Sequence, residues 1–261
     1  MTTAPDGIQV ENLVVRFGGL VAVNDVTLTA RLGRITALIG PNGAGKTTTF
    51  NACTGLVRPT SGHVRLDGRD VTRMSPAHRA RLGLGRTFQR MELFESLPVR
   101  DNVALGREAL VAGAKPWRHL RSARSARADA IARADEAMTR CGITTLAGRR
   151  PAELSTGQRR LVELARATAS GARMLLLDEP SSGLDRAETQ AFGEILESLV
   201  AGGDVGILIV EHDMALIMRI CNYGYVLDFG RLIFTGTAAE IAASDIVRAA
   251  YLGSQEVEVA V

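Results

Sequence analysis

The chain has 261 residues, which is enough for one large domain or two small ones with a sizeable hydrophobic core. Its 46% hydrophobic and 23% charged residues are typical of a globular protein and exclude a disordered chain, a collagen or a coiled coil. The net charge of +3 is too small to indicate nucleic-acid binding by itself. We find no signal-peptide pattern and no apolar run near the ~20 residues of a membrane helix, so we expect a cytoplasmic protein with reduced thiols.

Strand and helix patterns alternate along the chain, which predicts an α/β fold. Near the N-terminus, residues 8–17 and 22–30 alternate apolar and polar side chains, so we expect them to form antiparallel strands. Continuously apolar segments indicate strands that are buried on both faces. We place such strands at residues 34–39, 174–178, 205–210 and 223–228.

The middle of the chain differs, because residues 98–150 lack a strand pattern and are rich in Ala and Arg. Here Ile131, Ala134, Met138 and Cys141 recur at helical spacing, which predicts a helix with one packed face. The basic stretch 115–121 fits either a solvated face or a contact with a partner or with lipid head groups. We therefore predict a single domain over 1–261, with an α/β core and an antiparallel β subdomain at 1–88 and 166–236, a helical subdomain at 89–165, and a C-terminal helical tail at 237–261.

A glycine-rich loop follows the predicted strand at 34–39 and opens a helix. It matches the pattern Gly-x-x-x-x-Gly-Lys-Ser/Thr through Gly40, Pro41, Asn42, Gly43, Ala44, Gly45, Lys46, Thr47 and Thr48. Glycines let successive backbone N–H groups point at phosphate oxygens, and the helix N-terminus adds the positive end of its dipole. We expect Lys46 to reach the β- and γ-phosphates and the Thr47 hydroxyl to ligate Mg²⁺.

Two adjacent carboxylates end the predicted strand at 174–178. Ligands bind at the carboxyl ends of strands in open α/β sheets, so Asp178 and Glu179 should lie near the phosphate loop. We expect Asp178 to hold Mg²⁺ through water and Glu179 to polarise an attacking water as a general base.

Four further segments resemble motifs of the ABC-type ATPases. Residues 154–158 (Leu-Ser-Thr-Gly-Gln) resemble the signature motif, 182–185 (Ser-Gly-Leu-Asp) the D-loop, 211–213 (Glu-His-Asp) the switch histidine segment, and 87–89 (Thr-Phe-Gln) the Q-loop. They stand in the order and spacing of that family across residues 8–236. The resemblance implies a P-loop NTPase fold of the ABC nucleotide-binding type, with a RecA-like core, and it implies ATP and Mg²⁺ as ligands.

The resemblance also implies roles for the matching residues. The aromatic ring of Phe17 would stack on adenine with Val23 beside it, and His212 would contact the γ-phosphate. It implies that Gln89 senses both Mg²⁺ and the attacking water and links the site to a membrane partner. In a head-to-tail dimer, Ser155, Gly157 and Gln158 would bind the γ-phosphate of the ATP held by the other subunit. The D-loop residue Asp185 would also belong to the nucleotide-binding residues.

The segments at 17–23, 85–90, 93–94 and 250–253 are similar to those of the ATP-binding subunits of branched-chain amino-acid importers. Lipopolysaccharide-export ATPases share the 250–253 segment but usually differ around Gln89. Two residues depart from the pattern. Thr156 replaces the usual glycine of the signature motif, and Asp185 stands where many relatives have asparagine.

The resemblance thus implies an ATPase that couples hydrolysis to solute import, with transmembrane permease subunits and a second ATPase subunit, identical or different, as partners. It implies a position at the inner face of the cell membrane and no nucleic-acid partner. A permease helix would dock beside Gln89 along 89–105, with Arg90, Met91, Leu93 and Phe94 as candidate contacts.

Three alternatives stay open at this stage: a lipopolysaccharide-export-type ATPase, a soluble ABC-type ATPase that acts on nucleic acid, and a module that binds ATP without hydrolysing it. The second class usually carries long coiled-coil insertions or two fused cassettes, which 261 residues do not accommodate. The presence of Lys46, Glu179 and His212 argues against the third.

Overall fold

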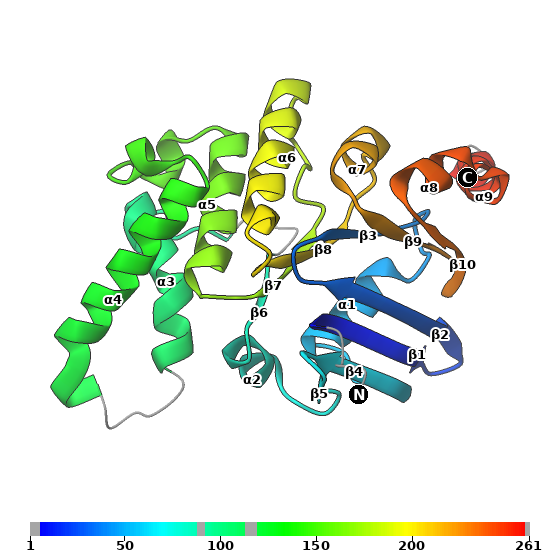
Figure 1. Ribbon diagram of the computed structural model, residues 1–261, viewed down its shortest axis with the longest axis horizontal. Helices are drawn as coiled ribbons and strands as arrows, with labels where there is room; N and C mark the ends of the chain where they lie inside the picture. Colours follow the sequence, from blue (N-terminus) through cyan, green and yellow to red (C-terminus); the bar gives the residue numbers. More distant parts are fainter. Residues whose placement is uncertain (1–5, 88–91, 113–118, 259–261) are drawn as a thin grey trace.

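Two β-sheets form the body of the molecule in the computed structural model, which describes residues 6–87, 92–112 and 119–258 (Figure 1). The smaller sheet is antiparallel and has the strand order β2-β1-β4-β5. Its strands are β1 (Gly7–Phe17), β2 (Leu20–Arg31), β4 (Ser61–Leu66) and β5 (Arg69–Asp70). The pairing of β1 with β2 confirms the two N-terminal strands predicted from alternation.

The larger sheet has the strand order β10-β9-β3-β8-β7-β6. Its strands are β3 (Ile35–Ile39), β6 (Leu84–Arg86), β7 (Met174–Asp178), β8 (Gly206–Val210), β9 (Tyr223–Asp228) and β10 (Arg231–Gly236). All pairs are parallel except that of β10 with β9. Every residue of β3, β7 and β8 is buried, which confirms these strands as covered on both faces.

Side chains of β3 alternate between two hydrophobic cores. Ile35, Ala37 and Ile39 point to the core shared with α6 (Arg186–Ala201) and α7 (Met214–Ile220). Leu38 points to the other core, which contains α1 (Lys46–Thr54) and the antiparallel sheet. The first helix is therefore held between the two sheets, and the loop before it is fixed at the carboxyl end of β3.

Helices α3 (Val99–Ala112), α4 (His119–Arg140) and α5 (Thr156–Ala169) form an arm beside the larger sheet, on the left of Figure 1. Ala134 and Met138 are buried in it, as the helical spacing predicts. Helices α3 and α4 are also joined by ion pairs, one of which links Arg107 of α3 with Asp129 of α4. Helix α5 runs to Ala169, so the expected boundary between residues 165 and 166 falls inside this helix.

Short elements complete the chain. They are α2 (Pro76–Arg81) ahead of β6, two 3₁₀ turns (Thr144–Leu146 and Pro151–Glu153), and the C-terminal helices α8 (Ala238–Ala243) and α9 (Asp245–Glu258). The last two form the expected helical tail. In the described ranges, none of the helices combines the length and the apolar character needed to cross a bilayer. Most of the basic stretch 115–121 lies outside the described residues.

Candidate nucleotide site

The glycine-rich loop between β3 and α1 is shaped by positions where only glycine fits. Gly40 and Gly45 have φ angles of +148° and +97°. A Cβ at Gly40 would lie 2.1 Å from the Leu227 carbonyl oxygen, and one at Gly45 would lie 2.6 Å from that of Ala22. Gly43 has a φ of +78° and open space around it. The loop is thus pressed against β9 and β2 from behind and is open in front.

Lys46 opens α1, and its ammonium group is folded over the loop. Its Nζ donates hydrogen bonds to the carbonyl oxygens of Gly40, at 2.7 Å, and Pro41, at 2.8 Å. Gly45, the residue before the helix, offers no side-chain cap, so the first N–H groups of α1 are left for an anion. Burial lowers the pKa of Lys46, while the nearby charges of Glu179 and Asp178 act in the opposite direction.

The paired carboxylates lie where the sequence predicts, at the carboxyl end of β7. Asp178 is 5% exposed and forms an ion pair with Arg86, whose Nη2 lies 3.0 Å from Oδ2. Burial raises the pKa of Asp178, and the positive charge of Arg86 counteracts this rise. Both carboxylates act on Lys46 electrostatically, so the structure brings the loop and the acidic pair into one site.

Glu179 has an unusual backbone conformation. Its φ is +46°, in the left-handed region that residues other than glycine rarely adopt. Its N–H donates to the Val210 carbonyl oxygen at 2.9 Å, which ties the residue to the end of β8. Backbone strain of this kind is concentrated at functional sites and costs on the order of 1–3 kcal/mol, so the sheet must hold Glu179 firmly in place.

His212 follows β8, and its side chain is 66% exposed, so it is available to a ligand. The residue before it, Glu211, is fully buried and works as a clamp. Its carboxylate accepts hydrogen bonds from the N–H groups of Ser181 at 2.8 Å, His212 at 3.1 Å and Asp213 at 3.4 Å. Glu211 therefore fixes the loop after β7 against the loop that carries His212.

The signature residues stand at the start of α5. Ser155 is the N-cap of this helix, and Gly157 is so close to α6 that a Cβ there would lie 2.6 Å from Oε1 of Glu188. Thr156 is exposed in the first turn of α5 and has no positive φ. Its methyl group lies 3.4 Å from the position of a Cβ at Gly183 in the D-loop segment.

Asp185 is the N-cap of α6, where its Oδ1 accepts a hydrogen bond from the Glu188 N–H at 2.8 Å.

Phe17 ends β1 with 51% of its surface exposed, as an aromatic platform requires. Val23 is fully buried in the core of the antiparallel sheet. The expectation that Val23 contacts adenine is therefore wrong for this structure, because its side chain packs behind the loop at Gly45. Gln89 lies outside the described residues.

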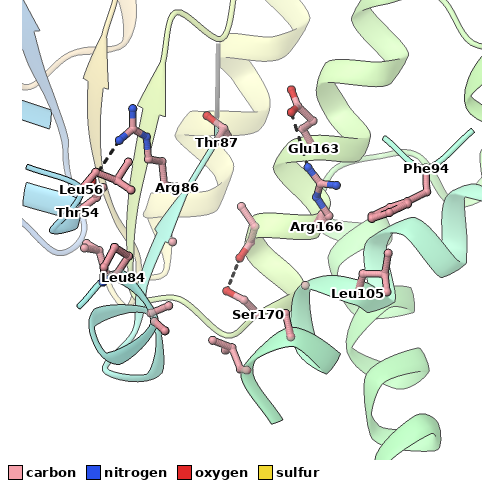
Figure 2. A pocket seen from close by; sticks show the side chains of 18 residues that line it. Thr54, Leu56, Leu84, Arg86, Thr87, Phe94, Leu105, Glu163, Arg166 and Ser170 are labelled. Carbon is pink, nitrogen blue, oxygen red and sulfur yellow. Dashed lines mark hydrogen bonds and ion pairs between the residues drawn. The ribbon is translucent and has the colours of Figure 1, made fainter. Parts of the chain in front are cut away.

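A mainly apolar groove of about 480 Å³ separates the arm from the core (Figure 2). Leu56, Leu84 and Arg86 line the core side, and Phe94, Leu105 and Arg166 line the arm side. Phe94 is 55% exposed, which is consistent with the predicted contact surface, whereas Leu93 packs on the core and Arg90 and Met91 lie outside the described residues. In the sequence, Arg86 stands out only as part of the 85–90 segment that is similar to importer ATPases. Neither its ion pair with Asp178 nor the hydrogen bonds to the Glu211 carboxylate can be inferred from the sequence.

A phosphate-binding loop, a lysine and an acidic pair at the carboxyl edge of a parallel sheet define a P-loop ATPase. The chain matches the family model for "ABC transporter" over residues 23–182. It is 38% identical to the high-affinity branched-chain amino acid transport ATP-binding protein LivG of Salmonella typhimurium, with 94% of this chain and 97% of that protein covered.

Two further proteins extend the comparison. The lipopolysaccharide export system ATP-binding protein LptB of Acidithiobacillus ferridurans is 34% identical, with 95% of this chain and 97% of that protein covered. The ADP conformation of MJ1267, described as an ATP-binding cassette of an ABC transporter, is 27% identical with a TM-score of 0.84, covering 96% and 100% of the two chains. The chain belongs to the ABC transporter family, as an ATP-binding subunit with ATPase activity.

Proposed function

We propose that this ATPase powers the import of branched-chain amino acids through permease subunits. The relatives named for that transport include LivG and also BraF of Pseudomonas aeruginosa, which is 35% identical over 258 residues. The single structural observation that carries the ATPase part is the meeting of Lys46, Asp178 and Glu179 at one edge of the sheet. The substrate class rests on the relatives.

The phosphates of ATP would lie on the open face of the loop at Gly43, next to the N-terminus of α1. Lys46 would exchange its bonds with two loop carbonyls for bonds to the β- and γ-phosphates, which are stronger because both partners are charged. Thr47 in the first turn of α1 and the Asp178 carboxylate suit Mg²⁺, which prefers oxygen ligands and is bound by few carboxylates plus phosphate oxygens. When bound, Mg²⁺ would neutralise the charge that develops on the phosphates.

Glu179 would accept a proton from the attacking water as the general base. Its left-handed backbone and its N–H bond to the Val210 carbonyl fix the main chain of Glu179 at the end of β8, and its charge acts on Lys46 at the start of α1. The exposed imidazole of His212, fixed at its backbone by Glu211, would contact the γ-phosphate. Gln89 would complete the water site, and Phe17 would stack on adenine.

A second cassette would supply the other half of each site. Ser155, Gly157 and Gln158 cluster at the N-terminus of a 14-residue helix, where the dipole favours a γ-phosphate. We propose a head-to-tail dimer in which these residues, with Asp185 at the same face, close over the nucleotide of the partner cassette. That partner is a second copy or a related ATPase.

The groove between arm and core would receive a helix of the permease, which places this subunit at the inner face of the cell membrane. Its lining is mainly apolar with arginines at both walls, and apolar and arginine side chains are typical of interface centres. Thr87, which precedes Gln89 by two positions in the sequence, lines the groove, so we expect a helix bound there to act on the segment that carries Gln89.

The test is amino-acid uptake in the source organism after deletion of the gene. Uptake of radiolabelled leucine, isoleucine and valine should fall and be restored by the wild-type gene, but not by a Glu179→Gln copy made at the same level. Unchanged uptake of all three amino acids would contradict the proposal. A simultaneous defect in lipopolysaccharide export would instead favour the function named for LptB.

A further inference from the structure

We propose that Arg86 is a positioning residue that connects the groove to the Mg²⁺-binding carboxylate Asp178. The inference rests on the proposed function in two respects, namely that a permease helix occupies the groove and that Asp178 helps to hold Mg²⁺. Arg86 lines the groove at the end of β6, and its guanidinium points from there toward α1 (Figure 2). Its Nη2 donates to Oδ2 of Asp178 at 3.0 Å.

The same guanidinium also holds the helix that carries the phosphate loop. Nη1 donates to Oδ1 of Asn51 at 2.6 Å and to Oγ1 of Thr54 at 3.1 Å, both in α1. Its central carbon lies 5.7 Å from the centre of the Phe50 ring, within the range of a cation–π contact. One side chain therefore bridges α1, the end of β7 and the wall of the groove.

The bridge is buried and stiff. The side chains of Arg86 and Asp178 are only 11% and 7% exposed, so water screens their charges weakly. Gly85, the residue before Arg86, leaves no room for a Cβ, which would lie 2.8 Å from Cβ of Ala172 and 2.9 Å from Cδ2 of Leu175. Strand β6 thus lies directly against β7. Because the packing is this tight, a displacement of the groove wall would also displace Arg86.

The chemistry follows from this placement. Through its hydrogen bond to Oδ2, Arg86 fixes the orientation of the Asp178 carboxylate, as the outer partners of metal ligands do. A helix that presses on the groove wall would move the guanidinium and with it the carboxylate. Because coupling between two binding sites is reciprocal, Mg²⁺ and nucleotide should in turn change the affinity for the permease.

The planar guanidinium of arginine is needed because its two terminal nitrogens donate hydrogen bonds to different elements, Nη2 to Asp178 at the end of β7 and Nη1 to α1. Lysine offers a single point charge and cannot serve Asp178 and α1 together. Arg86→Lys should therefore recover part of the function that Arg86→Met loses. The matched control is Arg173→Met, since Arg173 also forms an Arg–Asp pair of 3.0 Å, with Asp67, at an exposed position.

The experiment measures the affinity of the full-length protein for a fluorescent ATP analogue, with Mg²⁺ and with EDTA, and the permease stimulation of ATPase activity in the assembled transporter. In Arg86→Met, the affinity with Mg²⁺ should fall by about tenfold, which is typical of lost outer partners of metal ligands. Its affinity in EDTA should stay within about twofold, and permease stimulation should be lost. Arg173→Met should match the wild type in all three measurements.

An equal loss of affinity with and without Mg²⁺ would overturn the proposal, because a merely structural role predicts that result. Wild-type Mg²⁺ dependence in Arg86→Met would overturn it as well. If Arg86→Met does not fold, Arg86→Lys must show a smaller loss of the same kind, and a wild-type response of this variant would contradict the proposal. Failure of the proposed function is distinguishable, since the wild-type ATPase would then not respond to permease at all while the Mg²⁺ measurement still tests Arg86.

Discussion

Ser155 and Gln158 cap the first turn of α5 reciprocally. The Ser155 Oγ accepts a hydrogen bond from the Gln158 N–H at 3.2 Å, and the Gln158 Oε1 accepts one from the Ser155 N–H at 3.1 Å. This capping box fixes the start of the helix without help from the side chain of Thr156. Thr156 lies inside the box with a helical backbone and an exposed side chain.

Replacement of Thr156 by glycine should therefore have a small effect on catalysis. No positive φ has to be relieved, and the Thr156 methyl group stays at an ordinary van der Waals distance, 3.4 Å, from the place that a Cβ at Gly183 would take. We expect steady-state ATPase turnover of the assembled transporter to change by less than about tenfold, or ~1.4 kcal/mol in the barrier. A much larger gain would mean that threonine disables this signature motif and that the partner's motif drives hydrolysis.

The exposed ring of Phe94 should matter for permease binding. Phe94→Asp places a charge in the mainly apolar groove, so we expect the permease-stimulated part of ATPase activity to be lost while basal hydrolysis is retained. The double variant with Arg90→Asp should be uncoupled in the same way. The control is Ile246→Asp on α9, because Ile246 is 58% exposed and lies outside the groove lining. Equal stimulation of the Phe94 and Ile246 variants would place the docking surface elsewhere.

Arg79 should be important for stability, although it is not in the nucleotide site. It is 1% exposed, and its guanidinium donates to the carbonyl oxygens of Ala52, Cys53, Thr72 and Met74, two of which lie near the end of α1. Arg79→Met leaves these buried acceptors unpaired, so the free energy of unfolding should fall by at least about 2 kcal/mol. The control is Arg73, which is exposed in the turn ahead of α2, the helix that carries Arg79, and Arg73→Met should cost less than about 0.5 kcal/mol. Urea unfolding of both variants measures the difference, and equal midpoints would contradict this assignment.

The sequence predicts the elements that carry a strong local pattern. The strands at 174–178 and 223–228 agree with β7 and β9 to the residue. Every residue of β7 is buried, as its continuously apolar sequence predicts, whereas Tyr223, Tyr225 and Asp228 of β9 are only partly buried. Strand β6 is not predicted, since Leu84–Arg86 is too short for a periodicity and is defined by its pairing with β7. Strands β4 and β10 are missed for a related reason: their exposed faces dilute the apolar signal.

In the site, too, the sequence predicts local motifs but not contacts between distant segments. The phosphate loop and the acidic pair are local motifs, so spacing alone identifies them. The bridge from Arg86 to Asp178 spans 92 positions along the chain, and nothing in either segment indicates the other. The burial of Val23 is not apparent from the sequence, which shows that Val23 is near Phe17 along the chain but not which face of β2 it occupies.

We infer that Glu179 is the general base of an ATP-hydrolysing site built on the loop at Lys46, and the Glu179→Gln variant removes that base while keeping the shape of the side chain. The measurement is steady-state ATPase turnover together with equilibrium ATP binding, with Lys46→Ala as the comparison. Turnover in Glu179→Gln should fall by about 100-fold or more, because the amide cannot accept the proton, while ATP affinity is retained. Lys46→Ala should lose ATP affinity as well, through the missing charge on the phosphates. Wild-type turnover in Glu179→Gln would show that Glu179 is not the base.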